Sequence, residues 1–351
     1  MKRILITGAG GSPSTNFVRS LRLSPEKFYL IGVDCDKYNI QRAETDEKHL
    51  ISAKDDEYYL EILNNIIKET KADFLHAQNS AELEVLSENR EKLGTKYFLP
   101  DKETVRICQN KFETYKRWRE NSLPQPETLF LNNEDDLKET FKELGGKLWL
   151  REIKGSGGKW SFLADNFEQA KRWIELKAGW GKFTASEYLS PQSITWQSIW
   201  KDGELIVAQT RKRLSWEFAK ISPSGVTGAT GAAITVSDSK VDEIAQKSIF
   251  AIDKKPHGIF SVDLTYDKNN IPNPTEINIG RFFTTHEFFT KAGLNMPYIF
   301  IKLAFGESYP EIKKKINPLP ENLVWIRGID FLPVLVTLEE IEKRFDKLIK
   351  D

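Results

Sequence analysis

Short apolar runs alternate with amphipathic stretches through the first hundred residues. Lys2–Thr7, Phe28–Val33 and Ala72–Ala77 are apolar runs of the length typical of buried strands. Between them, Asn16–Leu23 and Tyr58–Thr70 place apolar residues at the spacing of a helix that buries one face. This alternation of strand and helix predicts a parallel sheet with helices on its faces.

The pattern changes near residue 110. One helix is predicted over Lys102–Asn121, and the proline-containing turn Leu123–Pro126 follows it. Several predicted strands beyond this turn are close enough in sequence to form hairpins, so we expect an α+β region with antiparallel sheet. These strands are Leu148–Ile153, Thr184–Tyr188, Ile194–Trp200, Leu205–Thr210 and Gly258–Tyr266.

Composition limits the partners and the compartment. A length of 351 residues corresponds to about two domains. The 51 Lys and Arg residues balance the 51 Asp and Glu residues, which argues against a nucleic-acid-binding surface. The two cysteines, Cys35 and Cys108, lack metal-ligand spacing, and their small number favours a reducing, cytoplasmic compartment. No apolar run approaches the roughly 20 residues of a membrane span, so no membrane partner is expected.

The first glycine cluster follows the first predicted strand. Gly8 and Gly10 lie in this turn, and Asp34 ends the next strand, where an acid that binds a ribose would lie. The third glycine of the dinucleotide-binding fingerprint is missing, because position 13 is Pro13. Three interpretations remain: a nicotinamide-dinucleotide site, a tight turn of an α/β domain, or a small-molecule site built from backbone N–H groups.

A second glycine cluster, Gly155–Lys159, follows the predicted strand that contains Arg151. Glycines allow a loop to fold closely over phosphate oxygens, and Lys159 and Arg151 would add positive charge there. The segment lacks the Gly-Lys-Ser/Thr ending of a P-loop, which argues against that class. The alternative is a flexible hairpin tip without a ligand.

A pair of carboxylates is the strongest chemical signal. If the hairpin after Gly258 is symmetric about Asn269 and Asn270, Asp263 lies opposite Glu276, and Asn278 shares their face. Two carboxylates in this position repel each other unless a cation lies between them. Carboxylate and amide oxygens are ligands for Mg²⁺. The alternative is the solvated face of an ordinary hairpin.

Together these segments resemble the ATP-grasp superfamily, in particular its carboxylate–amine ligases and its carbamoyl-phosphate synthase large-subunit-like members. Asn110–Lys111 and the proline turn resemble the start of its nucleotide-binding part, and Glu187–Leu189 resembles its adenine hinge. Glu276-Ile277-Asn278 resembles its metal signature. The resemblance implies a parallel α/β pre-ATP-grasp domain over residues 1–110 and a two-lobed ATP-grasp domain with antiparallel sheets over residues 111–351. Residues 111–190 would form the lid and phosphate-loop lobe, and residues 191–351 the metal-binding lobe.

The resemblance also implies roles for individual residues. The contacts to ATP would come from Lys111, Arg151, Gly155, Gly157, Gly158, Lys159, Glu187, Tyr188 and Leu189. The ligands of Mg²⁺, or of Mn²⁺ in its place, would be Asp263, Glu276 and Asn278. The catalytic arginines would be Arg281, Arg213 and Arg211.

The implied activity is that of an ATP-dependent ligase. It would activate a small-molecule carboxylate as an acyl phosphate for attack by an amine or similar nucleophile, and it is compatible with a homodimer. A noncatalytic nucleotide-binding module and a nicotinamide-dinucleotide-binding protein remain alternatives. We expect contacts to the carboxylate and the nucleophile from loops near Gly10–Ser14 and Asn79–Glu82.

Two features depart from the family pattern. Pro191 and Ser193 stand where the family has a glycine and then an acid that holds the ribose. Gly280 is inserted between Asn278 and Arg281, where the signature normally reads E-x-N-x-R. The departures leave ribose binding and the role of Arg281 open.

Overall fold

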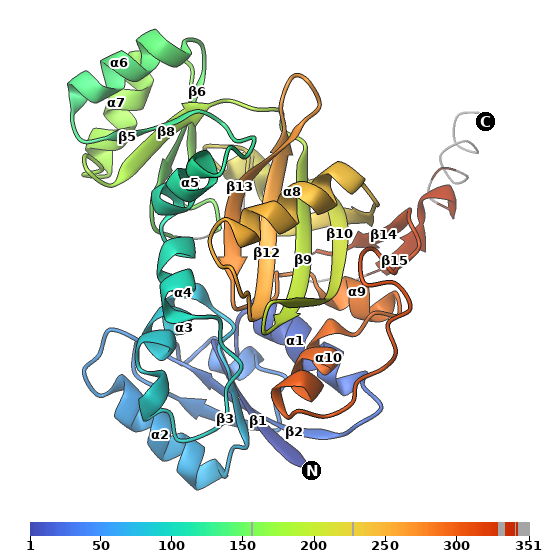
Figure 1. The fold of residues 1–351 in the computed structure, drawn as a ribbon. Coiled ribbons are helices and arrows are strands. Elements are labelled where there is room, and N and C mark those ends of the chain that lie inside the picture. The colour runs from blue at the N-terminus through green and yellow to red at the C-terminus, as the bar shows by residue number, and fades with distance from the viewer. Residues whose placement is uncertain (156, 227, 329–333, 341, 343–351) are drawn as a thin grey trace, which may run out of the picture.

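The computed structural model describes residues 1–155, 157–226, 228–328, 334–340 and 342 (Figure 1). Ser156, in the second glycine cluster, and the end of the expected metal-binding lobe lie outside the described residues. No helix in the described ranges is both long and apolar enough to cross a membrane.

The first part of the chain is an α/β unit with a parallel sheet in the order β3-β2-β1-β4. Its strands are β1 (Lys2–Thr7), β2 (Phe28–Asp34), β3 (Glu47–Leu50) and β4 (Phe74–His76), and its helices are α1 (Ser12–Arg22), α2 (Tyr59–Thr70) and α3 (Ser80–Glu88). The predicted parallel sheet is confirmed. Strand β3 was not predicted, because three of its four residues are polar or charged.

The helix predicted over Lys102–Asn121 is wrong: the structure has two helices, α4 (Lys102–Cys108) and α5 (Lys111–Glu120). The side chain of Asn110 accepts hydrogen bonds from the backbone N–H groups of Phe112 and Glu113. It therefore caps a new helix, as an asparagine with extended backbone commonly does. This break places Lys111 at the first position of α5.

A small antiparallel sheet in the order β5-β8-β6-β7 forms a separate lobe with two helices, at the upper left of Figure 1. We call it the lid lobe. Its elements are β5 (Thr128–Leu131), α6 (Glu134–Leu144), β6 (Leu148–Glu152), β7 (Phe162–Ala164), α7 (Phe167–Leu176) and β8 (Phe183–Glu187). It has an apolar core of its own, centred on Leu148, Leu150 and Ala185.

The largest sheet has the order β13-β12-β9-β10-β11-β14-β15, and its described strand pairs are antiparallel. Its strands are β9 (Ser193–Lys201), β10 (Glu204–Trp216), β11 (Thr230–Thr235), β12 (Gly258–Tyr266), β13 (Pro272–Ile279), β14 (Leu323–Ile326) and β15 (Val334–Thr337). The helices of this part are α8 (Ser239–Phe250), α9 (Glu287–Lys291) and α10 (Met296–Ala304). Short 3₁₀ helices occur at Ile40–Arg42, Arg90–Lys92 and Ala219–Ile221.

The α/β unit and the large sheet share one core. Phe17 and Phe74 of the α/β unit belong to the same buried apolar cluster as Ile259, Phe282 and Phe300 of the large-sheet part. Such a shared core opposes independent movement of the two parts. The lid lobe, with its separate core, is the part of the fold best placed to move relative to them.

Candidate active site

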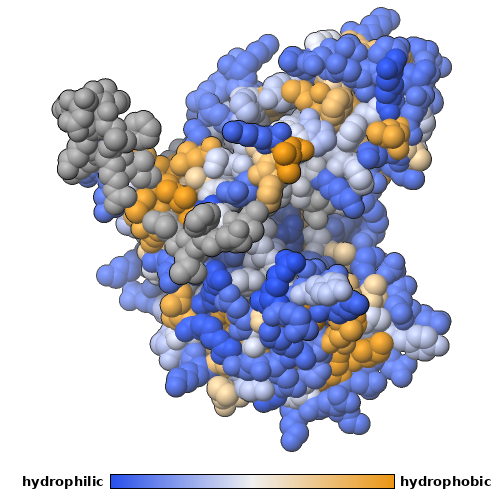
Figure 2. All heavy atoms as spheres, turned by 180° about the vertical axis from the view of Figure 1, so that it is seen from behind, coloured by the Kyte–Doolittle hydropathy of each residue, from blue (hydrophilic) through white to orange (hydrophobic). Residues whose placement is uncertain are grey.

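A cavity of about 580 Å³ lies where the lid lobe, the large sheet and the α/β unit meet. In Figure 2 the lid lobe stands apart from the lower body, with a hollow between them. All of the predicted site residues line this cavity: Lys111, Arg151, Gly155, Gly157, Gly158, Lys159, Glu187, Tyr188, Leu189, Arg211, Arg213, Asp263, Glu276, Asn278 and Arg281. Their common location shows that these segments, far apart in sequence, form one site.

The carboxylate pair lies on β12 and β13 in the predicted register. Asp263 is directly opposite Glu276, and Ser261 is opposite Asn278. The register shifts by one residue between Asp263 and Leu264, so the symmetric prediction fails only toward the turn. A β-bulge at this point causes the shift, since an extra residue on one strand leaves the rest of the ladder one position out of step.

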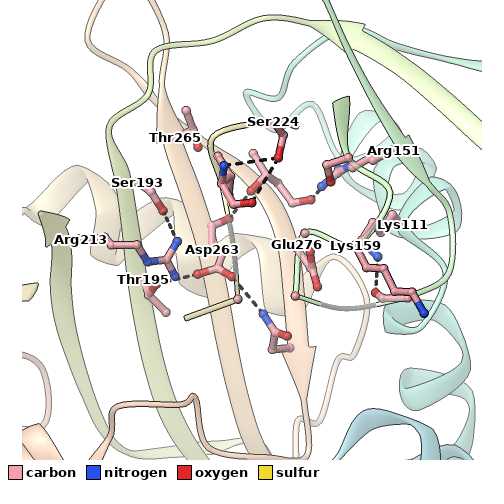
Figure 3. A pocket seen from close by; sticks show the side chains of 18 of the residues that line it. Lys111, Arg151, Lys159, Ser193, Thr195, Arg213, Ser224, Asp263, Thr265 and Glu276 are labelled. Carbon is pink, nitrogen blue, oxygen red and sulfur yellow. Dashed lines mark hydrogen bonds between the residues drawn. The ribbon is translucent and has the colours of Figure 1, made fainter. Parts of the chain in front are cut away.

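Asp263 is held by two hydrogen bonds (Figure 3). Its Oδ1 accepts from Thr195 Oγ1 at 2.6 Å, and its Oδ2 accepts from Asn278 Nδ2 at 3.0 Å. The carboxylate of Glu276 accepts no hydrogen bond from the residues that the structure describes, although the residue is only partly exposed. A partly buried carboxylate without a donor, opposite a second carboxylate, fits a divalent cation.

The donor set also fits a hard cation. Asp263 and Glu276 supply carboxylate oxygens, the ligand type that Mg²⁺ and Mn²⁺ prefer, and a nucleotide phosphate with waters would complete the shell. The Oδ1 atom of Asn278 accepts a hydrogen bond from Arg281 Nη2. Because an amide oxygen has two lone pairs, Asn278 can join the metal shell while it keeps this contact with Arg281.

Two cations approach the carboxylate pair from other elements. Arg151 on β6 donates from Nη2 to the backbone oxygen of Thr275 at 2.7 Å, while its buried Nε has no partner in the described part of the chain. Burial lowers the pKa values of Arg151 and Lys111, and the charge of Glu276 opposes this fall in both. The geometry thus brings cations and carboxylates into one low-dielectric site that can bind phosphate.

The glycine loop needs its glycines. Gly155, Gly157 and Gly158 have φ values of 120°, 71° and 70°, which other residues adopt only with strain. Lys111 Nζ donates to the backbone oxygen of Gly155 at 2.7 Å, so the loop is tied to the start of α5. Lys159 is exposed at the rim of the cavity, with its Nζ 5.1 Å from the ring centre of Trp160.

Part of the predicted adenine hinge, Glu187, already forms hydrogen bonds within the protein. The backbone N–H of Glu187 donates to the oxygen of Glu127 at 3.1 Å, and its carboxylate accepts from the N–H of Glu127 at 3.1 Å. The backbone of Leu189 makes no hydrogen bond to the residues described, so it remains free to meet the edge of a base. Tyr188 and Trp149, whose ring centres are 6.5 Å apart, add aromatic surface beside it.

Arg211 is a buried guanidinium without an acidic hydrogen-bond partner among the described residues. It is 1% exposed, its Nε has no partner there, and its Nη1 reaches Thr230 Oγ1 only at 3.4 Å. Burial, followed by the neighbouring charge of Arg213, lowers the pKa of Arg211 to about 9. An anionic ligand would supply the missing partner.

Arg213 accounts for one of the departures from the family pattern. Its Nη1 donates to Ser193 Oγ at 3.0 Å (Figure 3). Its Nε donates to Thr230 Oγ1 at 3.0 Å. Ser193, at the position of the family's ribose-binding acid, is therefore a partner of Arg213.

The inserted glycine does not remove Arg281 from the site. Gly280 has φ +69°, and a Cβ atom there would lie 2.5 Å from the side chain of Leu83. The resulting turn directs Arg281 back into the cavity, where it bonds Asn278 and donates from Nε to Ser80 Oγ at 2.8 Å.

The α/β unit contributes the far wall of the cavity. Pro13, Asn79 and Ser80 come from the two loops in which substrate contacts were expected, and Gln78 lies beside them. Several other lining residues were not predicted: Trp149, Thr195, Ser261, Phe283 and Thr284. Only Trp149 carried a usable signal, because it lies two positions before Arg151 on the same strand and so shares its face.

The first glycine cluster is a tight turn. Asp34 is buried, and its carboxylate accepts from the backbone N–H groups of Gly10 and Asp36, both at 3.0 Å. A Cβ atom at Gly10 would lie 2.0 Å from the backbone oxygen of Asn39. The chain therefore packs directly against Gly10, and the Asp34 carboxylate is engaged in holding the turn.

No protein-family model and no curated protein sequence matches the chain. Solved structures do match. N5-carboxyaminoimidazole synthetase from Staphylococcus aureus, complexed with ADP, is 16% identical with a TM-score of 0.68, over 93% of this chain and 81% of that one. The biotin carboxylase domain of Hydrogenobacter thermophilus 2-oxoglutarate carboxylase, with MgADP and bicarbonate, is 15% identical with a TM-score of 0.71, over 93% and 73%.

An L-amino acid ligase from Bacillus licheniformis is 13% identical with a TM-score of 0.69, over 98% of this chain and 85% of that one. These are structures of ATP-grasp proteins. The chain has the ATP-grasp fold. At these identities the likeness establishes the fold, and the predicted fold class is confirmed. The roles of the residues in the cavity of this ATP-grasp fold stay predictions.

Proposed function

We propose that this protein is an ATP-dependent ligase that activates a small-molecule carboxylate as an acyl phosphate for attack by an amine or similar nucleophile. The observation that carries the proposal is the opposed pair Asp263 and Glu276, with the partly buried Arg151 and the buried Arg211, both incompletely paired, in the same cavity. A carboxylate is a poor electrophile, and phosphorylation gives it a leaving group.

The charge of the cavity supports an anionic substrate besides the nucleotide. Among the described residues, seven cationic side chains and four carboxylates line it, which leaves a surplus of three positive charges. The cations are Lys111, Arg151, Lys154, Lys159, Arg211, Arg213 and Arg281, and the carboxylates are Glu152, Glu187, Asp263 and Glu276. An Mg²⁺–ATP complex carries about two negative charges, so about one positive charge remains. A carboxylate substrate would neutralise it.

The proposed reaction has two steps. A carboxylate oxygen attacks the γ-phosphorus of ATP, the bond from this phosphorus to the bridging oxygen breaks, and ADP leaves. The nitrogen of the amine then attacks the carbonyl carbon, the bond to the phosphate oxygen breaks, inorganic phosphate leaves, and the nitrogen loses a proton.

The chain's residues would bind and orient these groups. Lys111, Arg151 and Lys159 would contact the ATP phosphates, the Leu189 backbone would meet the adenine, and Arg281 would face the acyl phosphate. Mg²⁺ or Mn²⁺, when bound by Asp263, Glu276 and Asn278, supplies charge neutralisation on the transferring phosphoryl group.

Arg211 and Arg213 would bind the substrate carboxylate or the acyl phosphate made from it, and the glycine loop would keep water from this labile species. In a cytoplasmic enzyme of this kind, residues 1–110 would be the pre-ATP-grasp domain, residues 111–190 the lid and phosphate-loop lobe, and residues 191–351 the metal-binding lobe.

A substrate screen tests the proposal. The protein with Mg²⁺ and ATP is incubated with amino acids and small carboxylates, with and without an amine, and ADP and phosphate are measured. We expect one carboxylate–amine pair to release ADP and phosphate in equal amounts. ATP binding without any substrate-dependent release would favour the alternative, a noncatalytic nucleotide-binding module.

A further inference from the structure

The turn between β4 and α3 belongs to the α/β unit but forms part of the active-site cavity. Gln78, Asn79 and Ser80 all line it, and each makes hydrogen bonds that fix the turn. The side chain of Asn79 caps α3 by accepting from the N–H of Glu82 at 2.8 Å. The backbone oxygen of Ser80 accepts from Gln109 Nε2 at 2.9 Å. The Ser80 hydroxyl is therefore held in a defined place.

This hydroxyl meets Arg281 across the boundary between the two parts of the fold. Ser80 Oγ accepts from Arg281 Nε at 2.8 Å, over a sequence separation of 201 residues. The other end of the guanidinium donates from Nη2 to Asn278. Arg281 therefore has one hydrogen-bond partner in the α/β unit and one in the large sheet. The contact with Ser80 sets the rotation of the guanidinium plane.

Gln78 fixes the backbone next to Arg281. Its Oε1 accepts from the N–H of Phe282 at 3.3 Å, and its Nε2 donates to the oxygen of Phe282 at 3.3 Å and to that of Pro13 at 3.2 Å. His76 Nε2 lies 2.6 Å from Gln78 Oε1 and must carry the hydrogen, because that oxygen can only accept. Gln78 thus joins the segment that follows β4 to the segment that follows β13, beside the cavity.

We propose that Ser80 is a positioning residue that orients Arg281 toward the phosphoryl group in transfer, with Gln78 holding the adjacent backbone. The inference rests on the proposed function, since it assigns Arg281 to the reacting phosphate. It means that the α/β unit shapes the catalytic geometry directly, through a hydroxyl that no motif of the ATP-grasp part contains.

The test compares Ser80→Ala with two further variants. Ser80→Thr keeps a hydroxyl at the same position. Ser87→Ala is the matched control: Ser87 lies on the same helix, is buried, and its Oγ accepts from Arg90 Nη2 at 2.8 Å, but it is not part of the cavity wall. The probe is Mg²⁺–ADP with fluoroaluminate, which mimics a phosphoryl group in transfer and needs no knowledge of the substrate.

We expect Ser80→Ala to weaken the fluoroaluminate-dependent binding by roughly 10- to 150-fold, the loss typical of a hydrogen bond to a charged group. Affinity for Mg²⁺–ADP alone should change less than about twofold, because Ser80 would not touch ADP. Ser80→Thr should restore most of the loss, and Ser87→Ala should behave as wild type. Wild-type fluoroaluminate binding by Ser80→Ala, or an equal loss of Mg²⁺–ADP binding, would overturn the inference.

A second measurement separates this inference from the proposed function. If the wild-type protein shows no fluoroaluminate-dependent binding, the proposed phosphoryl transfer fails. Hydrogen exchange of the Arg281 Nε–H, followed by NMR, then decides the positioning role. Slower exchange in wild type and Ser87→Ala than in Ser80→Ala supports the orientation by Ser80, and equal rates in all three contradict it.

Discussion

Replacing Arg211 by methionine should make the ligand-free protein more stable and its ligand binding weaker. Arg211→Met keeps an unbranched side chain of similar length and removes the guanidinium. Arg211 is 1% exposed, and its Nε has no partner in the described residues. A buried charge without a carboxylate partner costs free energy that an apolar side chain does not.

The size of the effect follows from opposing contributions. A fall in the pKa of Arg211 from 12.5 to about 9 corresponds to about 5 kcal/mol of free energy against the charged form. The stack on Phe283, with 4.3 Å between the guanidinium carbon and the ring centre, offsets about 0.5–2 kcal/mol of this cost. The long hydrogen bond to Thr230 offsets about 1 kcal/mol at most. A net gain of about 2–4 kcal/mol remains, which should raise the melting temperature of a chain of this length by about 3–6 °C.

The assay is thermal melting with and without Mg²⁺–ATP, with Arg213→Met as the matched control. Arg213 is only partly buried, and its hydrogen bonds to Ser193 and Thr230 have an ordinary length of 3.0 Å. Its replacement should therefore give no such gain in stability. Arg211→Met should melt higher without ligand and lose substrate-dependent phosphate release. A melting temperature below wild type, together with normal turnover, would refute the assignment of Arg211 to an anion site.

The remaining predictions concern phosphate binding, pH and backbone strain. Arg151→Ala and Lys159→Ala should each weaken ATP binding or slow phosphate release by roughly 10- to 150-fold, and normal turnover of Lys159→Ala would reduce the glycine segment to an ordinary loop. Burial lowers the pKa of His286 to about 3. Because the unfolded chain takes up this proton below about pH 6.5, the free energy of unfolding should fall by up to about 1.4 kcal/mol per pH unit as the pH drops from about 6.5 toward 3. Urea titrations between pH 4.5 and 7 should show a shallower slope for His286→Leu, and an unchanged slope would contradict the prediction. Gly280→Ala should cost about 1–2 kcal/mol for its positive φ plus the clash with Leu83, more in urea unfolding than Gly306→Ala, which has a φ of +70° and whose Cβ would meet nothing within 4 Å. Equal losses would mean that the clash is relieved freely.

Local patterns were sufficient for the elements that form the site. The alternation of β12 and the symmetry of its hairpin gave the pairing of Asp263 with Glu276, because a hairpin fixes its own register. They could not give the bulge after Asp263, which depends on packing. The helix through residue 110 was misjudged because the capping side chain of Asn110 ends one helical pattern and begins another within two residues.

The far wall of the site could be located only approximately. Loops near Gly10–Ser14 and Asn79–Glu82 were expected to contact substrate, and in the structure they follow the parallel strands β1 and β4, whose carboxyl ends share one edge of the sheet. The contact between Ser80 and Arg281 joins residues 201 positions apart, and no local pattern marks either one for the other. Likewise, only the folded chain brings Ser193 to Arg213.

The carboxylate pair is the most direct test of the account, through Glu276→Gln. This variant keeps the size of the side chain and removes one of the two opposed charges. Melting curves with and without Mg²⁺–ATP, measured beside phosphate release, report metal binding and turnover separately. We expect a folded protein with a reduced Mg²⁺-dependent shift and almost no phosphate release. A full metal-dependent shift together with wild-type turnover would place the metal elsewhere and contradict the central claim.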